Sequence, residues 1–258
     1  MKKFDAVLLL FLMVIVAVLV RAENAREVVV TSAKELKGLK TKKITWKKDS
    51  AEMVLIPSTA TFEQKETFGR LGKPVTKTIK VLDGPDPVSF IWMSLKLPLV
   101  SLRSSCLKLI IRHFDSQLWG KFYKYSLTDK HPMIHVTWFD TTAYAEWAGK
   151  QLPTEAEWEH AARGGLEGKK YPWGDTIDSS KALYRQDSST VKSVSVGSYS
   201  SNGYGLYYMA GNVWEWCADW YGEDYYSYSL SRNPKGRVQA VPVLCGAVLG
   251  ATLQTSCV

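Results

Sequence analysis

The sequence is poor in the residues that hold soft metal ions. Its 258 residues include only four histidines and four cysteines. The cysteines are Cys106, Cys217, Cys245 and Cys257. They form no CxxC pair and no other spacing typical of a metal site, so no cysteine-based metal centre is predicted. Cys217 lies within a cluster of tryptophans, and we predict that it is a small buried hydrophobic residue.

Histidine is equally scarce, and His131 and His135 form its one close pair. An HxxxH pair binds metal when both rings lie on one face of a helix. Here the pair lies on an extended segment ahead of a strand-like run, Val136-Thr137-Trp138, so the rings need not face the same way. We interpret both as ordinary histidines, which leaves the chain without a histidine-rich iron site.

A long apolar run is also missing. The run Ala6–Val20 has fifteen residues, whereas a membrane-spanning helix needs about 20. It follows Lys2 and Lys3 and precedes a small-residue cleavage site, Val20-Arg21-Ala22, which is the pattern of a secretory signal. We predict that residues 1–22 are a signal peptide, that the protein is secreted or periplasmic, and that it has no stable membrane span. An uncleaved anchor is the alternative.

The positive charge is concentrated in one segment. The formal net charge is +8, and seven lysines crowd the residues just after the leader. They are Lys34, Lys37, Lys40, Lys42, Lys43, Lys47 and Lys48. An exported protein seldom meets nucleic acid, so we do not expect nucleic-acid binding. We predict that residues 23–50 are a solvated basic tether, which an anionic surface could attract.

Residues 51–258 have the length and apolar content of one domain, because 46% of the chain is hydrophobic. Apolar composition predicts a strand that ends at Pro57, and alternation predicts another over Val75–Leu82. The spacing of Ala143, Tyr144 and Trp147 predicts a helix over Asp140–Ala148, and Gly149 is predicted to end it.

A second helix is predicted after Thr154. Thr154 and Glu157 form a capping box, and Trp158, Ala161 and Ala162 give this helix a buried stripe. Glu155, Glu157 and Glu159 stand at alternate positions, which do not face one another on a helix. We therefore assign these carboxylates to capping and to solvent and not to paired-carboxylate catalysis.

The stretch Asn202–Trp220 combines glycines with three tryptophans and three tyrosines. It is too apolar for a surface loop and too rich in glycine for a regular helix, so we predict buried irregular backbone. Its polar groups suggest a metal site, because Asn212, Glu215 and the main-chain oxygen of Val213 offer the hard donors that calcium binds. The alternative is that the tryptophans are core residues and that Asn212 caps a turn.

Three motifs carry a family resemblance. The run GLYYMAGNVWEW, the upstream run VTWFDTTAYAEWAGKQLPTEAEWEHAARGG and the turn YPWGD resemble the sulfatase-modifying-factor family, the formylglycine-generating-enzyme-like (FGE-sulfatase) domain, from about Pro132 to Asp219. The resemblance implies a C-type-lectin-like α+β fold with little regular secondary structure, and bound calcium. It also implies an oxidation of a protein cysteine to formylglycine, with copper(I) held by two thiolates.

The chain departs from that family pattern at the residues that bind the ions. Leu183 stands where relatives place a calcium-binding Asn. If Ala247–Leu249 replace the closing Gly-Gly-Ser, the copper thiolates fall at Thr252 and Cys257, and threonine cannot bind copper. In a shifted frame neither position can encode cysteine. Copper is therefore not expected, and calcium is expected to be structural. Whether the chain is an enzyme stays open, and the residues favour a non-catalytic role. The alternative function is an exported module that binds a protein, a peptide or a glycan.

Two segments of the predicted domain do not follow the family pattern. Reading the codons of Phe90–Cys106 one frame over allows FYMDEFEVTVGQFKKFV, which is the missing strand and helix of the family. The same shift over Leu244–Val258 allows LRGGSWGDSPDFLR, which is its closing segment. Our hypothesis is that residues 84–118 and 239–258 are out of frame. We therefore expect Phe90–Ser116 to pack poorly or to form an adventitious helix, and the fold to be incomplete at the C-terminus, without the last strands.

From this pattern we also expect Pro132–Asp219 to form the core. Six tryptophans should be largely buried there. They are Trp138, Trp147, Trp158, Trp173, Trp214 and Trp216.

The frame hypothesis predicts the nucleotide sequence of the gene. Resequencing the locus should find insertions or deletions that bracket residues 84–118 and one after Val238. An uninterrupted frame that encodes the printed residues would contradict the hypothesis.

Overall fold

The computed structural model describes the chain in part. The described residues are 28–36, 39, 41–56, 61–66, 75–80, 91–93, 125, 128, 130–134, 136–176, 178–184, 192–220, 225, 242–249 and 252–257. For 61–66, 75–80, 91–93, 242–249 and 252–257 the description is of backbone alone. The predicted signal peptide lies outside these residues. Among the helices within them, none combines the length and apolar character that a membrane crossing requires.

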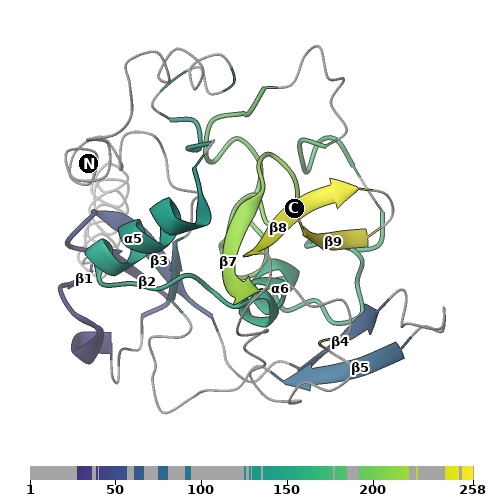
Figure 1. Cartoon of the computed structure of the whole chain (residues 1–258), viewed down its shortest axis with the longest axis horizontal. Coiled ribbons are helices and arrows are strands. Elements are labelled where there is room, and N and C mark those ends of the chain that lie inside the picture. The colour runs from purple at the N-terminus through teal and green to yellow at the C-terminus, as the bar shows by residue number, and fades with distance from the viewer. Residues whose placement is uncertain are drawn as a thin grey trace, which may run out of the picture.

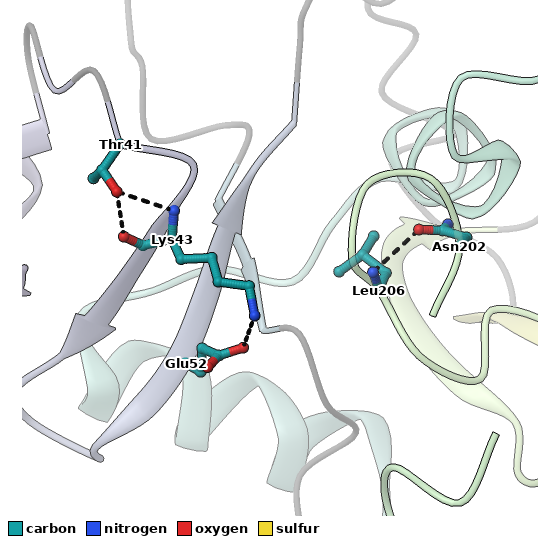
Figure 2. Close-up of polar contacts among 5 residues, drawn as sticks. All are labelled: Thr41, Lys43, Glu52, Asn202 and Leu206. Atoms are coloured by element: carbon teal, nitrogen blue, oxygen red, sulfur yellow. Dashed lines mark hydrogen bonds and ion pairs between the residues drawn. The ribbon is translucent and has the colours of Figure 1, made fainter. Parts of the chain in front are cut away.

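The first sheet has the order β1-β2-β3-β6. Its strands are Val29–Val30 (β1), Lys43–Trp46 (β2), Ala51–Leu55 (β3) and Ile91–Met93 (β6). β1 is parallel to β2, and the other pairs are antiparallel. On the exposed side of β2, the Lys43 Nζ donates to Glu52 of β3 at 2.9 Å, and the Thr41 hydroxyl donates to the Lys43 carbonyl (Figure 2).

This sheet corrects the prediction of a solvated tether over residues 23–50. Val30, Ile44, Trp46 and Met53 pack together with Leu36 of the short 3₁₀ helix Ala33–Leu36 (η1). The lysines described in this segment are exposed. Lys43 points away from the cluster on β2, and the others lie on η1 or beside the strand; they are Lys34, Lys42, Lys47 and Lys48. Their charge is therefore solvated as predicted, but part of the backbone that carries them belongs to a sheet.

The helix α5 (Trp138–Ala148) lies beside this sheet (Figure 1). It begins at a capping box formed by Thr137 and Asp140 and ends at Gly149 in the left-handed conformation, as the sequence predicted for its end. The Trp46 indole donates to the carbonyl of Ala148 at 2.7 Å, which ties the helix end to β2. Of the predicted buried face, Tyr144 is buried, Trp147 is half-buried and Ala143 is exposed.

A buried ion pair joins the same two elements. Lys150 donates to Asp49 Oδ2 at 2.5 Å, and the Tyr144 hydroxyl donates to that oxygen at 2.8 Å. Both charged side chains are largely shielded from water. Burial lowers the pKa of Lys150, and the hydrogen bond and charge of Asp49 oppose that shift. Asp49, in the turn after β2, therefore holds Lys150, which lies just past the end of α5.

The second helix, α6 (Glu155–Arg163), starts at the predicted capping box of Thr154 and Glu157. Trp158 is 1% exposed, and Ala161 and Ala162 are fully buried, as predicted. The assignment of Glu159 to solvent was wrong. Its side chain is buried and pairs with Arg163 one turn later. Burial raises the pKa of Glu159, and the charge of Arg163 opposes this rise.

The main core lies between α6, β3 and the stretch that follows residue 202. Val54 and Ile56 pack against Ala156, Trp158 and the α6 alanines, together with Leu206, Met209 and Cys217. Met53 and Val54 are neighbours in β3 and point to opposite faces, so the strand contributes to both hydrophobic clusters. The predicted core of Pro132–Asp219 is thus incomplete, because residues of 28–56 belong to it.

Asn202 holds the C-terminal end of α6 against a tight turn. Its Nδ2 donates to the carbonyls of Ala161 and Ala162 at 2.8 and 3.1 Å. Its Oδ1 accepts from the amide of Tyr204. It also accepts from the amide of Leu206, as Figure 2 shows. The backbones approach closely here, because a Cβ at Gly203 would lie 2.3 Å from the Gly164 carbonyl oxygen. Only glycine fits at this position.

A third sheet follows, with the order β7-β8-β9. Its strands are Glu215–Trp220 (β7), Pro242–Leu249 (β8) and Thr252–Cys257 (β9), and all its pairs are antiparallel. It lies next to α6 (Figure 1). The sequence interpretation missed β8 and β9, although Val and Leu at several positions of β8 favour a strand next to an available edge. It also treated residues 215–220 as irregular, and they are a strand.

The remaining predicted strands are confirmed. β3 covers most of the first predicted strand, and β5 (Val75–Lys80) covers the second and forms a hairpin with β4 (Thr61–Glu66). Ile91–Met93 lies within Phe90–Ser116, the segment expected to pack poorly or to form an adventitious helix, and it instead forms the strand β6 on β3. The rest of that segment, residues 90 and 94–116, lies outside the described part, so its poor packing stays a prediction.

The tryptophan prediction holds in part. Trp158 is buried, and Trp138, Trp147, Trp173 and Trp216 are half-buried. Trp214 is 36% exposed, so its predicted burial was wrong. The reason is its place on the turn just before β7, where the chain has not yet entered the sheet.

Asn202 gives a test of this packing. Asn202→Asp keeps the acceptor for the two turn amides but removes the donor to Ala161 and Ala162 and places a negative charge against their carbonyls. We expect a loss of roughly 2 kcal/mol of unfolding free energy, measured by chemical denaturation. The neighbouring exposed Ser201→Ala should change it by less than about 0.5 kcal/mol. Equal small effects of both variants would show that Asn202 does not hold the helix end.

Candidate functional site

The predicted ion-binding turn has a backbone that few residues adopt. Gly211 and Asn212 have φ angles of 82° and 66°, in the left-handed region. A Cβ at Gly211 would lie 2.2 Å from the Leu183 carbonyl oxygen, so a side chain there is excluded. The same oxygen accepts from the Asn212 amide at 2.9 Å. Leu183, whose side chain cannot bind calcium, therefore still supports the turn through its backbone.

The side chain of Asn212 links this turn to a neighbouring segment. Its Oδ1 accepts from the Val194 amide at 3.0 Å, and its Nδ2 donates to the Val194 carbonyl at 3.2 Å. These two hydrogen bonds to the backbone of one residue fix the orientation of the Asn212 side-chain amide. A carbonyl oxygen has two lone pairs, so the Oδ1 keeps the capacity for a second partner.

Glu215 lies three residues later, at the start of β7. Its Oε2 accepts from the Trp158 indole of α6 at 2.6 Å. Asn212 and Val213 thus lie on one short turn next to Leu183, and Glu215 follows them at the start of β7, where it contacts α6. Within the described residues no group of three or more His, Cys, Asp or Glu side chains is arranged to hold a metal. An ion at this turn would depend on amide and main-chain oxygens, which are hard donors that fit calcium.

A set of aromatic rings lies where β7 meets the start of α5, and we name it the aromatic face. It consists of Trp138, Phe139, Trp216 and Trp220. The Trp138 indole donates to the Cys217 carbonyl at 2.8 Å, and the Trp216 indole donates to the Val136 carbonyl at 3.0 Å. Trp138 lies between the rings of Phe139 and Trp220, with centroids 5.4 and 5.3 Å away. The rings are therefore held in fixed positions.

Phe139 is the exposed member of this face. Its side chain is 71% exposed, more than any other large hydrophobic residue of the described part. Sequence reasoning missed it, because the apolar residues of α5 do not gather on one face, so the sequence gives no sign of which way Phe139 points. A rigidly supported aromatic ring in water is typical of a contact residue.

Asp219 of β7 is a second residue that the sequence interpretation missed. It is 3% exposed, and its Oδ2 accepts from the amide of Glu155, the first residue of α6. Burial raises its pKa to about 7, and the charges of Glu155 and Glu157 add to this rise, whereas the Glu155 hydrogen bond opposes it. In the sequence, the pair Asp219-Trp220 gives no sign that the carboxyl group is buried.

The histidine pair is described only at His131, since His135 lies outside the described residues. His131 is buried, and its Nδ1 lies 2.8 Å from the Thr128 hydroxyl and 3.5 Å from the Ser195 hydroxyl. These contacts give the ring an ordinary hydrogen-bonding role. Cys217 is fully buried, as predicted.

Comparison with known proteins identifies the family to which this chain belongs. The model of the sulfatase-modifying factor enzyme 1-like domain matches residues 108–252, which is more than half of the chain. The chain belongs to this family. The elements α5, α6 and β7 described above lie within the matched residues.

Two curated relatives and one solved structure illustrate the breadth of the family. The chain is 47% identical over 118 residues to the formylglycine-generating enzyme of Streptomyces coelicolor, covering 41% of this chain and 38% of that protein. It is 51% identical over 115 residues to the serine/threonine-protein kinase pkn1 of Chlamydia pneumoniae, covering 43% and 18%. The FGE-sulfatase chain thus spans less than half of these relatives. The structure of Treponema denticola variable protein 1 has a similar fold, with a TM-score of 0.58 at 19% identity, covering 85% of this chain and 94% of that one.

Proposed function

We propose that this FGE-sulfatase chain is an exported, non-catalytic member of its family that binds a protein or peptide on the aromatic face. The observation that carries the proposal is Phe139, which is 71% exposed and packs edge-on against the Trp138 ring. Aromatic residues supply much of the energy of protein contacts, most of all where neighbouring groups hold them rigid. The indole hydrogen bonds of Trp138 and Trp216 provide that rigidity.

The residues at the copper positions support the non-catalytic part of the proposal. Copper(I) takes a pair of soft thiolates, and Thr252 occupies one of the two places where the family pattern puts them. Cys217 offers no substitute, because it is fully buried in the main core. We infer that the scaffold is retained in this chain for binding. The predicted signal peptide would deliver it to the periplasm or the cell exterior.

The binding proposal is tested with a variant that leaves the core intact. Phe139→Ala should weaken binding to an immobilised peptide array by about tenfold, with an unchanged melting temperature, because the ring contributes to contacts and not to the core. Leu166→Ala is the matched control, since Leu166 is another exposed apolar residue, 39% exposed, away from this face. Equal peptide binding by wild type and Phe139→Ala would contradict the proposal.

Two further measurements separate the alternatives. Retention on a glycan array that is lost in Phe139→Ala, with no peptide binding, would replace the peptide by a glycan. Copper binding together with oxygen consumption in the presence of a cysteine-containing peptide would show an active oxidase and would overturn the non-catalytic assignment.

We also propose that calcium is a structural ion of the turn that precedes β7. The ligands would be the Asn212 amide oxygen, the Glu215 carboxylate and the Val213 carbonyl. The Asn212 amide is already oriented by Val194, and Gly211 and Asn212 already hold the left-handed turn. Little ordering would then remain to be done on binding, which favours affinity.

Glu215→Gln tests the ion. A glutamine oxygen can still accept from the Trp158 indole, so the variant removes the negative charge and keeps this hydrogen bond. The melting temperature measured in calcium should fall by several degrees, whereas the value in chelator should be nearly unchanged, because only the calcium-bound form gains from the carboxylate. The exposed Glu146→Gln is the charge-matched control. Equal destabilisation in calcium and in chelator would remove calcium from the proposal.

A further inference from the structure

The junction between β7 and the start of α6 is built around one buried carboxyl group. Asp219 is 3% exposed, and its Oδ2 accepts from the Glu155 amide. Its Oδ1 has no hydrogen-bond partner in the described structure. The adjacent Ala218 amide donates to the Pro153 carbonyl at 2.6 Å, so two successive residues of β7 hold the chain that enters α6. We name these two contacts the clasp.

The charges that face Asp219 are negative. From α6, Glu155 and Glu157 act on it as like charges. β8, which pairs with β7, has the sequence PVLCGAVL and brings no acidic or basic residue. The charged groups of α5 and of the chain just past its end lie elsewhere: Asp140 is in its own capping box, Glu146 is exposed, and Lys150 pairs with Asp49. Within the described residues, no basic side chain is among the groups that act on Asp219.

A charged carboxylate in such a place carries two costs. It is removed from water with one oxygen that accepts no hydrogen bond, and it is repelled by two neighbouring carboxylates. The positive end of the helix dipole and the single Glu155 amide offset part of this cost. Protonation removes the charge and both costs, while Oδ2 can still accept from the Glu155 amide.

We propose that this junction is a pH-sensitive clasp, closed while Asp219 carries its proton and loosened when Asp219 ionises. The clasp holds the first turn of α6 on β7. β7 also carries Trp216 and Trp220, so the ordering of the aromatic face depends on the same strand. The device makes the folded domain firmer in mildly acidic surroundings than in neutral or alkaline ones.

The sign of the effect follows from proton linkage. The folded pKa of Asp219 is raised to about 7 from an ordinary value of 3.8. The folded state therefore binds this proton more tightly than the unfolded state does. The resulting stabilisation is fully present below the unfolded value. It is lost progressively as the pH rises and is gone above the folded value.

The test compares melting temperatures from pH 4.5 to 8.5 in chelator, so that calcium does not contribute. Wild type should lose several degrees between pH 5 and pH 8. In Asp219→Asn, whose amide carries no charge, this loss should shrink by at least half. Glu157→Gln keeps the capping box through its amide oxygen and removes one facing charge. The clasp requires the decline to end at lower pH in this variant, because loss of the Glu157 charge lowers the pKa of Asp219. A decline that stays where it is in wild type would mean that Asp219 does not respond to this charge.

Glu146→Gln on α5 is the control, because it removes an exposed carboxylate away from the junction. Its pH profile should match wild type. Hydrogen–deuterium exchange of the peptide that covers residues 154–159 gives a local readout and should become faster from pH 6 to pH 8, after correction for intrinsic exchange, in wild type but not in Asp219→Asn. If Asp219→Asn does not fold, Glu157→Gln alone decides. A Glu157→Gln profile identical to that of wild type, or an Asp219→Asn profile with the full wild-type decline, would overturn the proposal.

Discussion

The structure depends on the way that one irregular stretch satisfies the polar groups of α6. A helix buried in a core leaves amides at its start and carbonyls at its end without partners. At the end of α6, Asn202 donates to two carbonyls. At its start, Asp219 accepts from the first amide, and between the two ends Glu215 accepts from the Trp158 indole. The stretch 202–220 therefore follows the length of α6. It supplies hydrogen-bond partners at both ends of the helix, which allows the helix to be buried.

Buried charge is handled in three different ways. Asp49 and Lys150 form a pair that also receives the Tyr144 hydroxyl, so the charge is matched and its hydrogen bonds are made. Glu159 is matched by Arg163 on the same helix. Asp219 has no such counter-charge, and its environment favours the protonated form. A buried pair contributes to specificity of packing, whereas an unpaired group makes the packing depend on pH.

The residues that build this FGE-sulfatase fold are not those to which the family resemblance assigns copper. The elements that build the core here are the capped helices, β3 and the turn before β7. None of them includes the places that the family pattern gives to the thiolates. A chain can keep these elements and their aromatic face while it lacks a thiolate pair, because fold and site are set by different residues.

The sequence by itself determined the local features of this protein. The capping box of α6, the glycine stop after α5, the strands β3 and β5 and the burial of Trp158 and Cys217 follow from short-range patterns, because each depends on residues within a few positions of one another. The family resemblance was equally local in origin, since it rested on three motifs in order.

Only the tertiary structure decided which residues meet across the chain. It turned a lysine-rich segment into the strand β2, because Ile44 and Trp46 find apolar partners in η1 and β3. In the folded chain Glu159 and Asp219 are buried, and Trp214 and Phe139 are exposed. The Asn212 side chain accepts from the Val194 backbone amide. Burial and pKa depend on neighbours that lie tens of residues away, and no periodicity or spacing along the chain encodes those neighbours.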